Sequence, residues 1–139
     1  MRYSDGSMLI ELLIVIAIMT ILVVIAFPSY RAYTRRAHYT EVIQAAAPYR
    51  LGVEECYQTT NDLTQCAAGK NGVPKEVAEG TGVGLIHTIA VKDGVITTVP
   101  EEKYGIHAAD TYILTPTVQQ DQLDWRISGG GVEAGYVHG

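Results

Sequence analysis

The chain has few charged residues, few cysteines and little aromatic bulk beyond tyrosine. Only 18% of its 139 residues are charged. The chain has ten Lys and Arg residues and fifteen Asp and Glu residues, and this acidic excess disfavours a basic nucleic-acid-binding domain. Two cysteines are too few for a Cys-rich metal cluster. A hydrophobic content of 47% excludes a disordered chain. The length leaves room for one domain, not for a large multi-domain enzyme.

One long hydrophobic run dominates the sequence. Residues 8–27 contain a single charge, Glu11, and one other polar side chain, Thr20. A run of about 20 apolar residues is the length of a bilayer-spanning helix. The polar leader before it, residues 1–6, lacks the apolar core of a secretory signal peptide. The sequence therefore predicts a membrane segment followed by a small head.

Charge is divided unevenly along the rest of the chain. Residues 28–50 carry four arginines against one glutamate, a net +3, and residues 51–139 carry five bases against twelve acids, a net −7. Arginines beside an apolar helix are typical of a membrane interface, and the positive-inside rule would place them in the cytoplasm. Cys56 and Cys66 instead favour a head outside the cytoplasm, because two cysteines in an anchored head indicate a structural disulfide in an oxidising compartment. Their spacing fits neither a redox pair nor a zinc pair.

A long helix is predicted from Ser7 to about Cys56. After residue 27 the apolar residues recur at helical spacing along one stripe: Tyr39, Val42, Ala46, Tyr49, Val53 and Cys56. Pro28 and Pro48 each remove one backbone hydrogen bond and are expected to kink the helix or melt it locally.

Four strands are predicted at residues 85–91, 95–99, 111–118 and 123–127, joined as two hairpins by loops at 92–94 and 119–122. Pro116 predicts an edge position or a bulge, and Trp125 is predicted to lie in the core. The glycine-rich segments 61–84 and 128–139 are predicted to be irregular. The fold class is therefore α+β, with a long helix packed on a four-stranded antiparallel sheet.

Glu11 has no base one helical turn away on either side. A carboxylate inside a membrane costs up to about 3 kcal/mol, and less near the end of the span. One interpretation places Glu11 at the headgroup level, solvated and without a role. The other gives it a free amine as partner: cleavage after Gly6 would create one at Ser7, and pairing between chains would set a register during assembly.

The residues 6–18, GSMLIELLIVIAI, resemble the class III signal of type IV prepilins, in which a leader ends in Gly and Glu is the fifth mature residue. Other residues fall where type IVa pilins have their helix-kinking prolines, aromatic pair and base: Pro28, Tyr30, Tyr33, Arg36 and Pro48. Segments 56–74, 111–117 and 124–125 also resemble a loop and the last two strands of that family. The resemblance covers nearly the whole chain.

The resemblance implies a pilin fold with a leader, 1–6, removed by a prepilin peptidase, a transmembrane and filament-core helix, 7–28, and a globular head, 29–139. It implies storage in the inner membrane with a periplasmic head, then assembly into a homo-oligomeric extracellular pilus with Glu11 facing a neighbour's amine. The implied function is a structural subunit, not an enzyme, that supports adhesion, twitching motility or DNA uptake. The alternatives are a minor or competence pilin that binds DNA or a host surface, and a pseudopilin of a type II secretion system.

Three departures from the family pattern limit what is carried over. Ser7 stands where Phe or another apolar residue is usual, which leaves methylation of the new amine open. Thr20 replaces a common mid-helix Gly. The segment 127–132 lacks the C-terminal cysteine pair of many pilins, so adhesin functions of that loop are not carried over.

No catalytic, cofactor or metal site is predicted. Asp121 and Asp124 fall where related pseudopilins bind calcium, but few further ligand oxygens are assured nearby. The four histidines are scattered and none lies beside a cysteine. Arg31, Arg35 and Arg36 could contact nucleic acid, which the acidic head disfavours.

Overall fold

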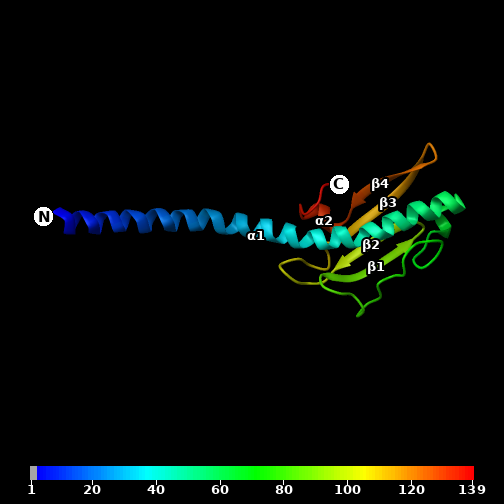
Figure 1. Cartoon of the computed structure of the whole chain (residues 1–139), viewed down its shortest axis with the longest axis horizontal. Coiled ribbons are helices and arrows are strands. Elements are labelled where there is room, and N and C mark those ends of the chain that lie inside the picture. The colour runs from blue at the N-terminus through cyan, green and yellow to red at the C-terminus, as the bar shows by residue number, and fades with distance from the viewer. Residues whose placement is uncertain (1–2) are drawn as a thin grey trace. The chain divides into compact units, whose positions relative to one another are not determined.

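The computed structural model describes residues 3–139 and, in the first helix, side chains from Gly6 onward. The chain divides into two compact units, one running to Thr34 and the other Arg35–Gly139. Helix α1, Tyr3–Thr60, is 58 residues long (Figure 1) and extends the predicted helix by a few residues at each end. It continues through Pro28 and Pro48, so neither proline melts the helix. Both proline rings lie at exposed positions of the helix.

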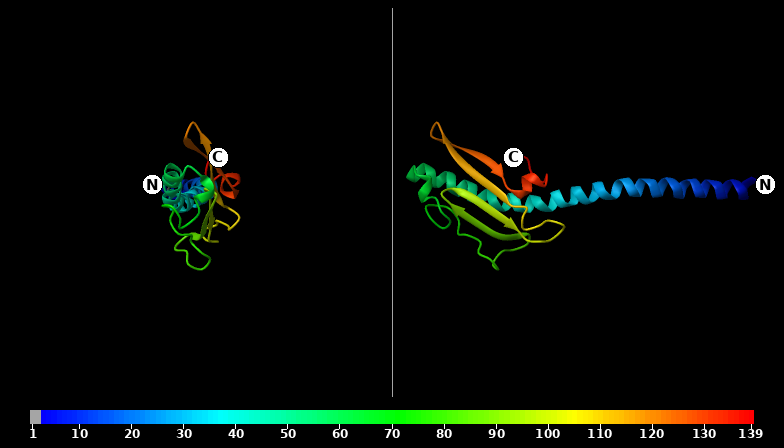
Figure 2. Two further views of the ribbon diagram at one scale, coloured as in Figure 1. Left: turned by 90° about the vertical axis from the view of Figure 1, so that its right-hand side faces the viewer. Right: turned by 180° about the vertical axis from the view of Figure 1, so that it is seen from behind.

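The second unit contains a four-stranded antiparallel sheet in the order β1-β2-β3-β4. The strands are β1 (Ile86–Lys92), β2 (Val95–Pro100), β3 (Tyr112–Gln119) and β4 (Gln122–Ser128). The later part of α1 runs along one side of the sheet (Figures 1 and 2). The predicted α+β fold is therefore confirmed.

Both hairpin loops are shorter than predicted. Asp93–Gly94 and Gln120–Asp121 are two-residue turns, and all four residues have positive φ, between 51° and 79°. Such turns match the right-handed twist of the strands they join, so pairing continues to the turn itself. Lys92, Gln119 and Gln122, predicted as loop, are strand residues for this reason.

Pro116 lies in a strand that has neighbours on both sides, yet it occupies a locally free edge. β2 pairs with β3 only at Tyr112, Ile113 and Leu114, whereas β4 pairs with β3 along its whole length. Pro116 is opposite Trp125 of β4 and lies beyond the last residue paired with β2. A missing N–H costs nothing there, which confirms the edge position.

The core forms between the amphipathic part of α1 and the sheet. All six residues of the predicted helical stripe are buried, and they pack with apolar residues of the strands and connections, including Leu85, Ile89, Ile96, Ile106 and Leu114. Trp125 was predicted as core, which is wrong: it is half-buried and packs at the margin. Its indole Nε1 donates a hydrogen bond to Glu54 Oε1 at 2.9 Å, and this polar end favours the margin.

The two glycine-rich segments contain short ordered pieces. Segment 61–84 includes a 3₁₀ turn, Leu63–Gln65, whose first residues are capped by the Asp62 carboxylate. Val77 forms an isolated antiparallel bridge with Ile89 of β1. The tail was predicted to be irregular throughout, which is wrong, because it contains the four-residue helix α2, Gly130–Glu133. Backbone bonds from Gly131 to Thr111 and from Tyr136 to Gly131 fold the tail back on itself.

Candidate functional site

The apolar run forms a helix that nothing else in the described chain covers. Its large apolar side chains, from Met8 to Phe27, have exposed fractions between 51% and 67%. An 18-residue window of this helix has a mean hydropathy of 3.1 and is long and apolar enough to cross a membrane. A surface of this size in water is strongly unfavourable, so this helix requires an apolar environment from outside its own chain.

Two polar side chains interrupt the apolar surface, and they differ in how they are satisfied. Thr20 Oγ1 donates to the Ile16 carbonyl at 2.8 Å within the same helix. Glu11 is exposed, and no other described residue forms an ion pair or side-chain hydrogen bond with it. A carboxylate without a partner is costly once this helix is placed in an apolar environment. Glu11 is therefore the residue of this helix that most needs an external base.

Gly6 and Ser7 lie at exposed positions in the first turns of α1. A methyl group added at Gly6 would meet no atom within 4 Å. Packing within the described chain therefore gives no reason for glycine at this position, and the peptide bond after Gly6 is not covered by it.

The predicted disulfide is confirmed. Cys56 and Cys66 are bonded, with their Cα atoms 5.8 Å apart, and both are fully buried. The bond ties the last turns of α1 to the segment that follows the 3₁₀ turn. The chain then returns across the helix at Gly52, where an added methyl group would lie only 2.8 Å from the Gly72 carbonyl oxygen. The disulfide and this close crossing together fix the loop on the helix.

The C-terminal tail has no disulfide, and a different set of contacts holds it. Gly131 N donates to the Thr111 carbonyl at 2.9 Å, and Gly130 N donates to Thr111 Oγ1 at 3.2 Å. Tyr39 Oη lies so close to Gly131 that a methyl group there would collide with it. The sequence reasoning missed this contact set. Its only signal was the three consecutive glycines at 129–131, which permit close backbone approach.

Other polar contacts of α1 were also missed. Glu41 accepts a hydrogen bond from Leu85 N at 2.5 Å, ahead of β1. Arg50 lies over the Trp125 ring, 5.5 Å from its centroid, and pairs with Glu54 at 3.6 Å. The Glu41–Leu85 and Arg50–Trp125 contacts join residues far apart in the sequence, so no periodic pattern predicts them. Arg50 and Glu54, in contrast, have the i,i+4 spacing of a helical ion pair.

The possible metal ligands do not gather at one site in the described chain. In the part of the chain that the structure describes, no three His, Cys, Asp or Glu residues are grouped closely enough to hold a metal ion. Asp121 lies in the β3–β4 turn, and the Asp124 carbonyl accepts from Thr117 Oγ1 across the hairpin. Arg31 lies over the Phe27 ring, 5.4 Å from its centroid.

The fold is that of a pilin, and known proteins agree. The chain is similar to the solution structure of the major type IV pilin PpdD from enterohemorrhagic Escherichia coli, with a TM-score of 0.54 and 25% identity over 70% of each chain. No protein-family model matches. The chain is 36% identical to prepilin peptidase-dependent protein D of Escherichia coli K12 over 73% of this chain and 67% of that protein. The chain belongs to the type IV pilin family.

A second relative matches more strongly over a shorter stretch. The type IV pilus subunit protein TapA of Aeromonas hydrophila is 42% identical over 74 residues, which are 53% of this chain and 52% of TapA. The matched stretch therefore spans about half the length of that relative.

Proposed function

We propose that the chain is a structural subunit of a type IV pilus that polymerises through residues 7–28 after a prepilin peptidase cuts between Gly6 and Ser7. The observation that carries the proposal is the exposed apolar helix with Glu11 near its start. A membrane and a filament core both supply the apolar surroundings that this helix needs. The printed name of the Escherichia coli relative, a prepilin peptidase-dependent protein, supports the same processing step here.

Glu11 acts in this proposal as the assembly residue. Cleavage creates an amine at Ser7, and in a bundle of parallel helices the carboxylate of one subunit pairs with the amine of another. An ion pair formed in apolar surroundings is costly to break once made, so it fixes the axial register of neighbouring helices. Hydrophobic packing, which is non-directional, then supplies the bulk of the association energy.

The proposed organisation has a leader, residues 1–6, a helix, 7–28, that crosses the inner membrane and later enters the filament core, and a head, 29–139, that begins in the periplasm. The Cys56–Cys66 disulfide supports an oxidising compartment for the head. After assembly the head lies outside the cell on the pilus.

The pilus would support adhesion, twitching motility or DNA uptake. The net charge of −7 over residues 51–139 favours the first two over direct contact between the head and DNA, because phosphates repel acidic surfaces. The compact head of the described chain suits a major or core subunit.

The test compares Glu11→Val with Thr20→Val. Both variants keep the helix apolar, and both remove one polar side chain from it, but the Thr20 hydroxyl is already satisfied within its own helix. We expect both proteins to insert into the inner membrane normally. Sheared filaments should be abundant for Thr20→Val and scarce for Glu11→Val. Normal filaments from Glu11→Val would contradict the assembly role of Glu11.

A further inference from the structure

Residues 78–84, here called the flap, cross one side of the head between two fixed points. Val77, just before the flap, pairs with Ile89 of β1 through two backbone hydrogen bonds of 3.0 and 3.1 Å. Leu85, just after it, is buried in the core. The flap itself is rich in glycine, and within the described chain it forms no strand or helix. Its position therefore depends on a few side-chain contacts.

The end of the flap nearest β1 is held by contacts that do not involve His87. Leu85 N donates to the Glu41 carboxylate of α1 at 2.5 Å, and Glu101 N donates to the Leu85 carbonyl at 2.7 Å. Lys103 Nζ donates to the Gly84 carbonyl at 3.4 Å. These three contacts fix the base of the flap.

The start of the flap is held by His87. The β1–β2 register shifts between Ile86 and Thr88, so His87 is the extra residue of a bulge, and bulges redirect side chains out of the regular sheet pattern. Its Nδ1 lies 3.1 Å from Glu101 Oε1, and its Nε2 lies 3.3 Å from Glu79 Oε1 in the flap. Both ring nitrogens of His87 thus face carboxylate oxygens.

When both carboxylates are ionised, only a protonated imidazole can donate a hydrogen bond to each of them. Neutral histidine has one N–H donor and one lone pair, whereas an ionised carboxylate is an acceptor only. In the neutral ring, one nitrogen would present its lone pair to a carboxylate at hydrogen-bond distance, which is repulsive. The imidazolium donates to both carboxylates at once, and each of these bonds is charge-assisted.

We propose that His87 is a proton-operated latch that holds the flap against the sheet when it is protonated and releases it at Glu79 when it is neutral. Of the two contacts, the one between His87 and Glu79 breaks when His87 is neutral. It is the longer of the two, and the Glu79 side chain is 82% exposed, against 38% for Glu101. The charged groups that face His87 are Glu101 after β2 and Glu79 in the flap. Glu41 and Lys103 bind the base of the flap instead.

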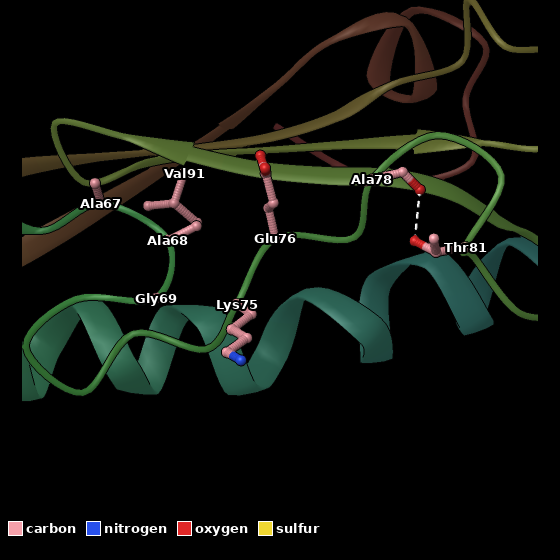
Figure 3. Close-up of a pocket in the computed structure, with 8 residues that line it drawn as sticks. All are labelled: Ala67, Ala68, Gly69, Lys75, Glu76, Ala78, Thr81 and Val91. Carbon is pink, nitrogen blue, oxygen red and sulfur yellow. Dashed lines mark hydrogen bonds between the residues drawn. The ribbon is translucent and has the colours of Figure 1, made fainter.

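The latch controls one wall of a groove on the head. Ala78 and Thr81 of the flap line an open groove of about 610 Å³, together with Lys75, Glu76 and Val91. Figure 3 shows the Thr81 hydroxyl bonded to the Ala78 carbonyl across this wall, at 2.7 Å. Glu79 and Gly80 lie between these two residues, so the contact between Glu79 and His87 ties this wall to β1. The inference concerns the head alone and does not depend on filament assembly.

The direction of the pH effect follows from the same contacts. The hydrogen bond to Glu101 raises the pKa of His87 above its ordinary value of 6.5, with desolvation opposing and Glu79 adding to the rise. Proton binding therefore favours the closed flap. The stabilisation is fully present below pH 6.5 and is lost as pH rises through the higher pKa of the closed form.

The test is amide hydrogen exchange of the full chain in detergent micelles, measured by NMR below and above the titration midpoint of the His87 ring and corrected for intrinsic rates. The Thr81 amide, bonded to the Ala78 carbonyl, reports the flap, and the Ile89 amide reports the sheet. We expect the protection of the Thr81 amide to fall as the pH rises through the His87 midpoint. The size of the fall should equal the ratio of the acid dissociation constants of His87 in the open and closed forms. Ile89 protection should stay constant.

Glu79→Gln should abolish the pH step at Thr81 and lower the midpoint of His87. The control is Glu133→Gln, which removes an equal charge from α2. In this variant the pH step at Thr81 and the midpoint of His87 should be unchanged. Constant Thr81 protection across the His87 titration in the unsubstituted chain would overturn the latch, as would a full pH step in Glu79→Gln.

Discussion

Tyr39 joins three separate parts of the head through one side chain. It is fully buried, its hydroxyl donates to the Asp110 carbonyl at 2.8 Å, and its ring centroid lies 5.0 Å from that of Tyr136 in the tail. Gly131 lies directly against the hydroxyl. These contacts fasten the tail to α1 without the C-terminal cysteine pair of many pilins.

Replacing Gly131 by Ala should loosen the tail. The new methyl group would collide with Tyr39 Oη, and such overpacking costs about 1–3 kcal/mol. Urea unfolding followed by tyrosine and tryptophan fluorescence measures the loss. Gly139→Ala is the control, because its methyl group would lie 3.0 Å from the nearest atom, at the chain end. Equal unfolding midpoints for the two variants would refute the importance of this contact.

Strongly alkaline solution should destabilise the head through its buried tyrosines. Desolvation raises the pKa of Tyr39 far above its ordinary value of 10.0, and burial also raises the pKa of Tyr49 and Tyr112. The unfolded chain then loses its phenolic protons first, so stability falls as pH rises above about 10, by up to about 1.4 kcal/mol per pH unit for each such group. Thermal unfolding against pH measures the slope, and Tyr39→Phe should make it shallower. An unchanged slope in that variant would refute the assignment.

At the scale of elements, the end of α1 and the loop after it form one covalently closed piece. The Cys56–Cys66 bond spans ten residues of sequence and joins two fully buried positions. A loop of this length restricts the unfolded chain and stabilises the folded one by about 2–3 kcal/mol.

The double replacement Cys56→Ser and Cys66→Ser should therefore lower the free energy of unfolding by about 2–3 kcal/mol. It should also increase hydrogen exchange, most of all in residues 61–74. Reduction of the unsubstituted protein should have the same effect. If reduction leaves the melting temperature unchanged, the disulfide does not stabilise the head as described.

The elements differ in how well the sequence predicts them. The stripe from Tyr39 to Cys56 was predicted residue by residue, because helical periodicity is a local signal and a single sheet was available to cover it. The hairpin turns were predicted too long, since the residues beside a two-residue turn look like loop. The Tyr39–Gly131 contact and the His87 contacts with Glu79 and Glu101 were not predicted, because they join residues that only the finished fold brings together.

At the scale of the whole molecule, the two units have opposite solvent requirements. The helical unit up to Thr34 exposes its large apolar side chains, while the unit Arg35–Gly139 buries a core of its own. Its excess of acids suits contact with water. The average composition of the chain therefore describes neither unit.

A chain consisting of residues 29–139 should accordingly be soluble without detergent and fold with its disulfide formed. The full chain should require detergent, because residues 8–27 remain apolar and uncovered. Analytical ultracentrifugation and circular dichroism of both chains check this. Aggregation of the 29–139 chain in aqueous buffer would show that the head depends on the apolar helix for its stability.

Mass spectrometry of the protein from sheared surface filaments tests the central claim, that this chain is processed and then polymerises. We predict a species that begins at Ser7, with the two-hydrogen loss of one disulfide. A further methyl group on the Ser7 amine would identify the modification that the sequence leaves open. Filaments that lack the chain, or that contain it with residues 1–6 still attached, would contradict the account.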